Sequence, residues 1–192
     1  MYTIKLFEEK YKEGVEGVCI AASTRANSKE SEWGKVILRL FCRYYIEMEK
    51  EHCVIAVNDM DEVIGYVICA SNYDQWKDNF ETQYLNTCED MDTVNFGKLS
   101  ITGMKQYAKE YPAHLHINVH PNYQRMGIGN KLLEKLVDIL KQESIKGLML
   151  DVSATNEKGI NYGFFFVNCK NFIYRLVDCF YYCCCSTYLL SN

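Results

Sequence analysis

A short loop with two glycines holds the residues of this sequence that are best suited to bind an anion. Gly127 and Gly129 lie between a strand-like segment and a helix-like segment. The first turn of a helix leaves backbone N–H groups unpaired, and its peptide dipoles place partial positive charge there. Glycine lets the backbone approach phosphate oxygens without a Cβ in the way. The loop therefore predicts a pyrophosphate site, to which Arg125 and Lys131 add positive charge.

Two glycines alone are weak evidence for such a site. A helix can also begin with glycines because they allow close packing, and this interpretation is equally good for the loop in isolation. The loop is not a Walker loop, because the Gly-Lys-Ser/Thr ending is absent, and it lacks the three-glycine dinucleotide fingerprint.

The elements around the loop are clearly patterned. Residues 114–120 alternate, which predicts a strand with Leu115, Ile117 and Val119 on one face and the histidines on the other. Residues 127–142 carry an apolar stripe at helical spacing, and residues 148–153 predict a second strand. Elsewhere we expect strands at residues 2–7, 53–57, 63–70 and 172–190. We expect helices at residues 8–22, 72–111 and 157–169, and a further helix that is capped by Ser31 and runs to residue 45. This order predicts an α/β (α+β) fold with a mixed central sheet.

Composition narrows the class of protein. A chain of 192 residues with 48% hydrophobic content predicts a single domain, here with a helical insertion at about 72–111. A net charge of -4 argues against nucleic acid as a partner. Acids near the first residue argue against a secretory signal, and no window approaches the ~20 apolar residues of a membrane span, so we expect a cytoplasmic protein without a membrane partner. The ten cysteines include no Cys-x-x-Cys pair, so we expect core thiols and no metal.

The window at 115–133 resembles the cofactor motif of the GNAT N-acetyltransferase superfamily: a strand, Val-x-Pro-x-x-Gln/Arg-x-x-Gly-x-Gly/Ala, and an amphipathic helix. The resemblance implies acetyl-CoA, as acetyl donor, in a V-shaped opening between two splayed parallel strands at 114–120 and 148–153. The run at 111–117 also looks like the acetyltransferase-like domains related to the C-terminal region of O-GlcNAcases. By resemblance, backbone groups near His120 also contact the cofactor arm, and the cofactor-binding residues are Asn118, Val119, Gln124, Arg125, Met126, Gly127, Ile128, Gly129 and Asn156.

The family reaction is attack by a neutral amine on the thioester, which needs a base, an oxyanion donor and an acid for the thiolate. His116 and His114 share a strand face beside the expected opening, and histidine titrates near neutral pH, so both are candidate bases. An equally good interpretation is that both are structural histidines. Asp151 is a further candidate base. An acid often stands in the O-GlcNAcase-related domains where this chain has Asn118. Tyr162 is the candidate acid, although a tyrosine there is more often a core residue.

The acceptor is expected to be a small-molecule or peptide amine. Acids between 74 and 92 suit a cationic amine, or else form a solvated helix face. The alternative function is a catalytically weak or inactive GNAT-fold module that binds CoA or interacts with a partner. A homodimer through the segment at 180–190, which is rich in Tyr, Cys and Leu, is a further hypothesis.

Overall fold

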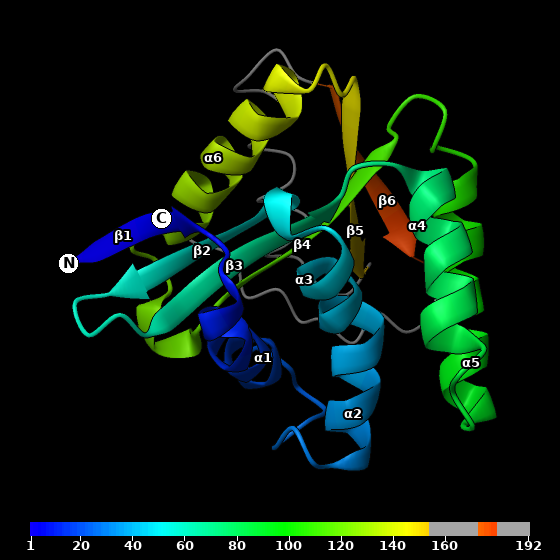
Figure 1. Ribbon diagram of the computed structural model, residues 1–192, viewed down its shortest axis with the longest axis horizontal. Helices are drawn as coiled ribbons and strands as arrows, with labels where there is room; N and C mark the ends of the chain where they lie inside the picture. The colour runs from blue at the N-terminus through cyan, green and yellow to red at the C-terminus, as the bar shows by residue number, and fades with distance from the viewer. Residues whose placement is uncertain (154–172, 180–192) are drawn as a thin grey trace.

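A mixed sheet forms the centre of the protein (Figure 1). The structure is a computed structural model that describes residues 1–153 and 173–179, with side chains as far as residue 150. The strands run in the spatial order β1-β2-β3-β4-β5-β6, antiparallel from β1 to β4 and parallel from β4 to β6. Their bounds are Tyr2–Leu6 (β1), Cys53–Asn58 (β2), Val63–Ala70 (β3), Ala113–Val119 (β4), Gly147–Ser153 (β5) and Ile173–Cys179 (β6). The predicted mixed α/β sheet is confirmed.

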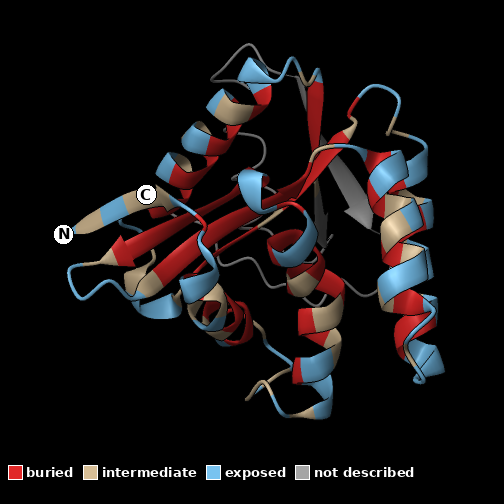
Figure 2. Ribbon diagram, viewed as in Figure 1, coloured by how far each residue is buried: buried red, intermediate tan, exposed pale blue. Residues whose placement is uncertain are grey.

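Helix α6 (Ile128–Gln142) covers one face of the sheet (Figure 1). A 3-10 turn, η5 (Pro121–Tyr123), connects β4 to the loop that precedes α6. The apolar stripe of α6 packs on Leu115, Ile117 and Val119 in one buried cluster. The buried side of α6 faces the buried strands (Figure 2). The predicted alternation of β4 is therefore confirmed, with its apolar residues on the α6 face.

The opposite face is covered by the helices of the first fifty residues. A 3-10 turn, η1, leads into α1, and a second helical stretch runs through α2, η2 and α3 to a short turn, η3. Their bounds are Glu9–Tyr11 (η1), Lys12–Ala21 (α1), Glu32–Leu38 (α2), Arg39–Arg43 (η2), Tyr44–Met48 (α3) and Lys50–His52 (η3). The predicted cap is confirmed, because the backbone N–H of Gly34 donates to Ser31 Oγ at 3.1 Å. The π-helical geometry of η2 is a feature that the sequence did not indicate.

Residues 72–111 are helical, as predicted, and contain no strand. They form α4 (Tyr73–Phe80), the π-helical segment η4 (Glu81–Leu85) and α5 (Met91–Lys105), and α5 contacts β6. Asp90 caps α5 by accepting from the backbone N–H groups of its first turn.

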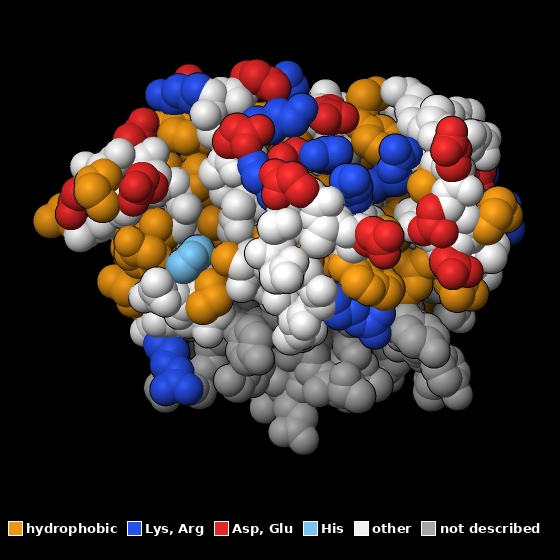
Figure 3. Space-filling model, turned by 90° about the horizontal axis from the view of Figure 1, so that it is seen from below, with side chains coloured by type: hydrophobic (Ala, Val, Ile, Leu, Met, Phe, Trp, Pro, Cys, Tyr) orange, Lys and Arg blue, Asp and Glu red, His pale blue; other side chains and the backbone are white. Residues whose placement is uncertain are grey.

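The surface beside these helices is charged with both signs. On the face drawn in Figure 3, acidic and basic side chains are interspersed. None of the described helices combines the length and apolar character needed to cross a membrane.

Candidate active site

Strands β4 and β5 separate after only three residue pairs. Ala113, His114 and Leu115 pair with residues 148–150 of β5, and the remaining residues of the two strands do not pair with each other. β5 stays paired with β6 as far as Ser153. The carboxyl ends of two parallel neighbours therefore separate, as the resemblance implied, and leave the outer edge of β4 beyond Leu115 without a strand partner among the described residues. We refer to the gap between these strand ends as the opening.

The backbone of β4 presents two residues to this opening. The N–H of His120 donates to the carbonyl of Ile64 at 2.9 Å, on the β3 side. Hydrogen-bonding groups alternate between the two edges of a strand, so Asn118 also bonds toward β3, whereas Ile117 and Val119 face the opening. Val119 thus lies where the cofactor arm was expected. The backbone groups of Asn118 and His120 do not face the opening, because they hydrogen-bond to β3.

Ile117 is the residue that sequence reasoning missed on this edge. Its type carries no chemical signal, because only its backbone faces the opening. Backbone groups on one edge of a strand belong to every second residue, so Val119 would have indicated Ile117 once it was known which edge of β4 pairs with β3.

The loop before α6 has the backbone shape of an anion site. Gly127 has φ +74° and Arg125 has φ +63°, so the chain turns sharply into the helix. Within the described residues, the backbone N–H groups of Gly127, Ile128 and Gly129 find no hydrogen-bond acceptor. Apart from its chain neighbours, a Cβ placed on Gly127 would meet no atom of the described residues within 4 Å, which leaves room beside the turn. These unpaired donors and the free space beside them fit a pyrophosphate.

The other loop residues border this turn. Met126 is exposed, with 52% of its surface accessible, and Arg125 is exposed as well. Gln124 turns back to β4, where its Nε2 donates to the carbonyl of Val119 at 3.4 Å. That contact occupies the carbonyl of Val119 and leaves its N–H on the open edge.

His114 and His116 meet at one hydroxyl group. The Nε2 atoms of both rings lie 3.0 Å from the hydroxyl oxygen of Tyr45. A hydroxyl donates one hydrogen and also accepts, so Tyr45 suits one histidine that accepts and one that donates. The ring of Phe41 lies 5.4 Å from that of His116, and the ring of Trp76 lies 4.4 Å from that of His114. The pair is thus enclosed by aromatic side chains.

This surrounding changes the acid–base chemistry of the pair. Burial lowers the pKa of His116 to about 4. Burial, followed by the nearby charge of a protonated His116, holds the pKa of His114 well below its usual range. The structure therefore differs from the expectation that these histidines titrate near neutrality. A neutral imidazole of such low pKa accepts a proton weakly at neutral pH, so the arrangement favours hydrogen bonding over general-base chemistry.

Asn118 contributes an unpaired oxygen at the start of the opening. Its Nδ2 donates to the hydroxyl of Tyr66 at 2.7 Å, and its Oδ1 is buried with no hydrogen-bond partner in the described part of the chain. A buried carbonyl oxygen without a partner is rare, because the lost hydration is costly. It is a ready acceptor for an N–H group of a ligand.

Other predicted site residues lie beyond the described structure. Asn156 and Tyr162 fall outside the described residues, and so does the side chain of Asp151. Tyr45, Tyr66 and Trp76, which the sequence did not single out, reach β4 from elements 38 to 71 residues away along the chain. Only their aromatic character is visible in the sequence, and it is shared by many core residues.

Comparison with known proteins agrees with this geometry. Residues 22–162 match the Acetyltransferase (GNAT) family. The chain belongs to this family. The ribosomal protein bS18-alanine N-acetyltransferase of Escherichia coli (strain K12) is 36% identical over 64 residues, which are 33% of this chain and 43% of that relative. The chain therefore spans less than half the length of the curated relatives that it matches.

Solved structures show the same fold at low sequence identity. The crystal structure of SsHAT aligns with a TM-score of 0.67 and 19% identity, over 78% of this chain and 81% of that one. An N-acetyltransferase from Staphylococcus aureus Mu50 aligns with a TM-score of 0.53 and 12% identity, over 86% and 82% of the two chains. Kinship with the O-GlcNAcase-related domains stays a prediction.

Proposed function

We propose that this protein transfers the acetyl group of acetyl-CoA to an amine. The observation that carries the proposal is the start of α6, where three N–H groups have no acceptor among the described residues and follow η5 and the strand that borders the opening. An anion at the helix start and an extended arm along β4 are the two parts of a CoA molecule that these features suit.

The residues for holding the cofactor follow from this geometry. The amides of Gly127, Ile128 and Gly129 would bind the pyrophosphate, and the backbones of Ile117 and Val119 would bond the pantetheine arm as an added strand does. When bound, acetyl-CoA supplies an activated acetyl thioester. The N–H of Val119 is the donor best placed for the thioester oxygen as it gains negative charge.

The amine would approach from the side of β4 that carries the even-numbered side chains. Asn118 Oδ1 would accept a hydrogen from the amine nitrogen and orient its lone pair, because an amide oxygen accepts but does not take up the proton. His116 and Tyr45 line the same side, and burial lowers the pKa of His116 to about 4, so that its ring is neutral near pH 7. The proton would leave through water, because the neutral ring of His116 is a weak base.

A binding module that does not catalyse transfer is the second candidate. The observation that favours it is the low pKa of the paired histidines, which makes both rings weak bases at neutral pH. Such a module would bind acetyl-CoA but would release no free thiol with any amine. An amine panel read by thiol release separates the two candidates.

A pair of glycine substitutions tests the cofactor site. In the described part of the chain, an added Cβ on Gly127 or on Gly103 would have no atom within 4 Å apart from its own neighbours, but of these two glycines only Gly127 has a positive φ. Gly127→Ala should weaken acetyl-CoA binding about tenfold or more, because the Cβ enters the pyrophosphate cradle and strains the turn. Gly103→Ala, within α5, should bind the cofactor as the wild type does. Calorimetric titration measures both, and equal affinity of the two variants would refute the assignment of the loop.

A further inference from the structure

The loop between η5 and α6 carries a cation that its neighbours leave free. The side chain of Arg125 is exposed and makes no hydrogen bond or ion pair with the described residues. Lys131, the other cation predicted to serve this loop, is already paired, since its Nζ lies 3.1 Å from Glu134 Oε2. Of these two cations, only Arg125 is therefore free to meet an anionic ligand.

The backbone at Arg125 is held in a conformation that suits glycine better. Its φ of +63° lies in the left-handed region, where a Cβ crowds the following carbonyl oxygen. Contacts on both sides fix the loop: Gln124 Nε2 donates to the carbonyl of Val119 at 3.4 Å, and the hydroxyl of Tyr2 lies 3.5 Å from the carbonyl oxygen of Met126. Strain that neighbouring contacts impose in this way is frequent where proteins clamp a ligand. The turn itself would form more easily with glycine, so the arginine calls for another explanation.

Acetyl-CoA offers two anionic groups to this end of the protein. The amides of Gly127, Ile128 and Gly129 already match its pyrophosphate under the proposed function. The second group is the 3′-phosphate, a monoester with a charge of about −1.5 to −2 at pH 7. The same ribose carries both groups, so the 3′-phosphate must lie beside the amides rather than on them.

Arg125 has the reach and the chemistry for this second group. It precedes Gly127 by two residues, so their Cα atoms lie within about 7 Å of each other. A long arginine side chain that starts there extends past the turn. The planar guanidinium donates two parallel hydrogen bonds to phosphate oxygens, which a single ammonium group does not.

We propose that Arg125 binds the 3′-phosphate of acetyl-CoA, so that the protein distinguishes CoA thioesters from those of 3′-dephospho-CoA. This inference rests on the proposed acetyl transfer. It differs from the sequence prediction, which placed the charge of Arg125 at the pyrophosphate. The pyrophosphate is then left to backbone amides, and cofactor selectivity depends on one side chain.

The test is calorimetric titration with acetyl-CoA and with acetyl-3′-dephospho-CoA, without any amine present. The wild type should bind acetyl-CoA about fivefold more tightly, as expected for a bidentate ion pair at the surface. Arg125→Gln should bind acetyl-CoA about fivefold more weakly than the wild type does. It should bind the dephospho compound as the wild type does, because that ligand lacks the group that Arg125 contacts.

Two further variants serve as controls. Lys131→Gln removes a positive charge from the same helix start and should keep the fivefold ratio between the two ligands. Arg125→Gly should lose the ratio and yet melt no lower than the wild type, because glycine adopts the left-handed conformation without strain. This variant also decides the question if Arg125→Gln does not fold.

The possible failures are distinguishable. If Arg125→Gln weakens both ligands by the same factor, Arg125 serves the pyrophosphate and the assignment is overturned. Loss of the ratio in Lys131→Gln, with the ratio kept in Arg125→Gln, would move the assignment to Lys131 and overturn it as well. Equal affinity of the wild type for the two ligands would overturn only the role of Arg125. Absence of binding by either ligand would overturn the proposed transfer together with it.

Discussion

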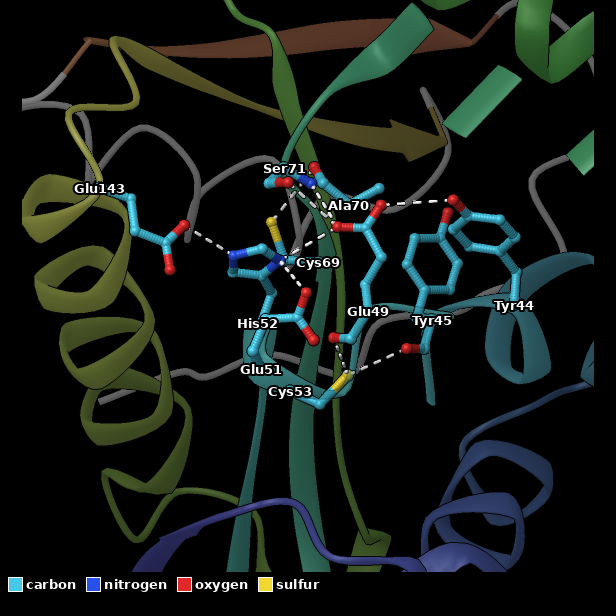
Figure 4. A network of polar contacts seen from close by, with 10 residues as sticks. All are labelled: Tyr44, Tyr45, Glu49, Glu51, His52, Cys53, Cys69, Ala70, Ser71 and Glu143. Atoms are coloured by element: carbon cyan, nitrogen blue, oxygen red, sulfur yellow. Dashed lines mark hydrogen bonds and ion pairs between the residues drawn. The ribbon is translucent and has the colours of Figure 1, made fainter. Parts of the chain in front are cut away.

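His52 is held between two carboxylates, and this arrangement predicts a pH-dependent stability (Figure 4). Its Nδ1 lies 3.0 Å from Glu49 Oε2, and its Nε2 lies 2.8 Å from Glu143 Oε2 at the end of α6. Glu51 is a third carboxylate, 4.0 Å from Nδ1. Burial acts to lower the pKa of His52, but the hydrogen bonds and charges of Glu49 and Glu143 outweigh it and raise the pKa to about 9.

The size and direction of the effect follow from linkage. A rise from 6.5 to about 9 corresponds to about 3 kcal/mol of stabilisation of the folded state. Because the pKa is raised on folding, this stabilisation is fully present below pH 6.5. It is lost as pH rises from 6.5 to about 9, where the folded protein gives up its extra proton. His114 and His116, whose pKa values are lowered, act in a different window, below pH 6.5.

Glu143→Gln isolates the contribution of Glu143 to this stabilisation, because glutamine has a similar shape and the change removes one negative charge beside His52. We expect the free energy of unfolding to fall by about 1 to 2 kcal/mol at pH 6.5, as for a hydrogen bond between charged groups. The difference from the wild type should vanish near pH 9.5. Urea denaturation at half-unit steps from pH 6 to 9.5 measures it.

Glu134→Gln is the matched control on the same helix. Glu134 lies 3.1 Å from Lys131, and its charge is not one of those that raise the pKa of His52, so its loss should not change how stability depends on pH between 6.5 and 9.5. Parallel pH curves for the wild type and Glu143→Gln would refute the reasoning, since they would mean that Glu143 does not raise the pKa of His52 in the folded state.

Two further stability predictions concern the start of α2. Ser31→Ala should lower the free energy of unfolding by about 1 kcal/mol, because the N–H of Gly34 loses its cap, whereas Ser31→Asp should retain most of it. Both are measured by urea denaturation. Gly34→Ala should be more damaging, by about 3 kcal/mol, because the added Cβ would lie 2.0 Å from the backbone oxygen of Ser28 and the chain must move. An unchanged thermal midpoint of Gly34→Ala would contradict this packing.

The elements next to the site were predictable because their signals are local. The period of two at residues 114–120 and the helical stripe at residues 127–142 each reflect burial of one face. Both elements lie within a residue or two of the expected bounds. The Ser31 cap was equally readable, since a cap and the amide that it bonds are three residues apart.

The chemistry of the site was less predictable, because it depends on contacts between distant segments. The hydroxyl of Tyr45 contacts histidines 69 and 71 residues further along, and no local pattern specifies such a meeting. Burial by those contacts is what lowers the pKa of His116. The sequence could therefore place two histidines on one strand face, but it could not say that they would be neutral.

Strand β4 serves two purposes because its side chains and its backbone groups alternate together. Ile117 and Val119 turn their side chains into the core under α6, and the same residues turn their backbone groups to the opening. His116 and Asn118 do the reverse, with backbones bonded to β3 and side chains on the proposed acceptor side. A cofactor held by backbone groups makes no demand on residue type, so the odd positions are free to be apolar. Under the proposed acetyl transfer, acceptor selectivity would then reside in the even positions and in the aromatic side chains of η2, α3 and α4 that enclose them.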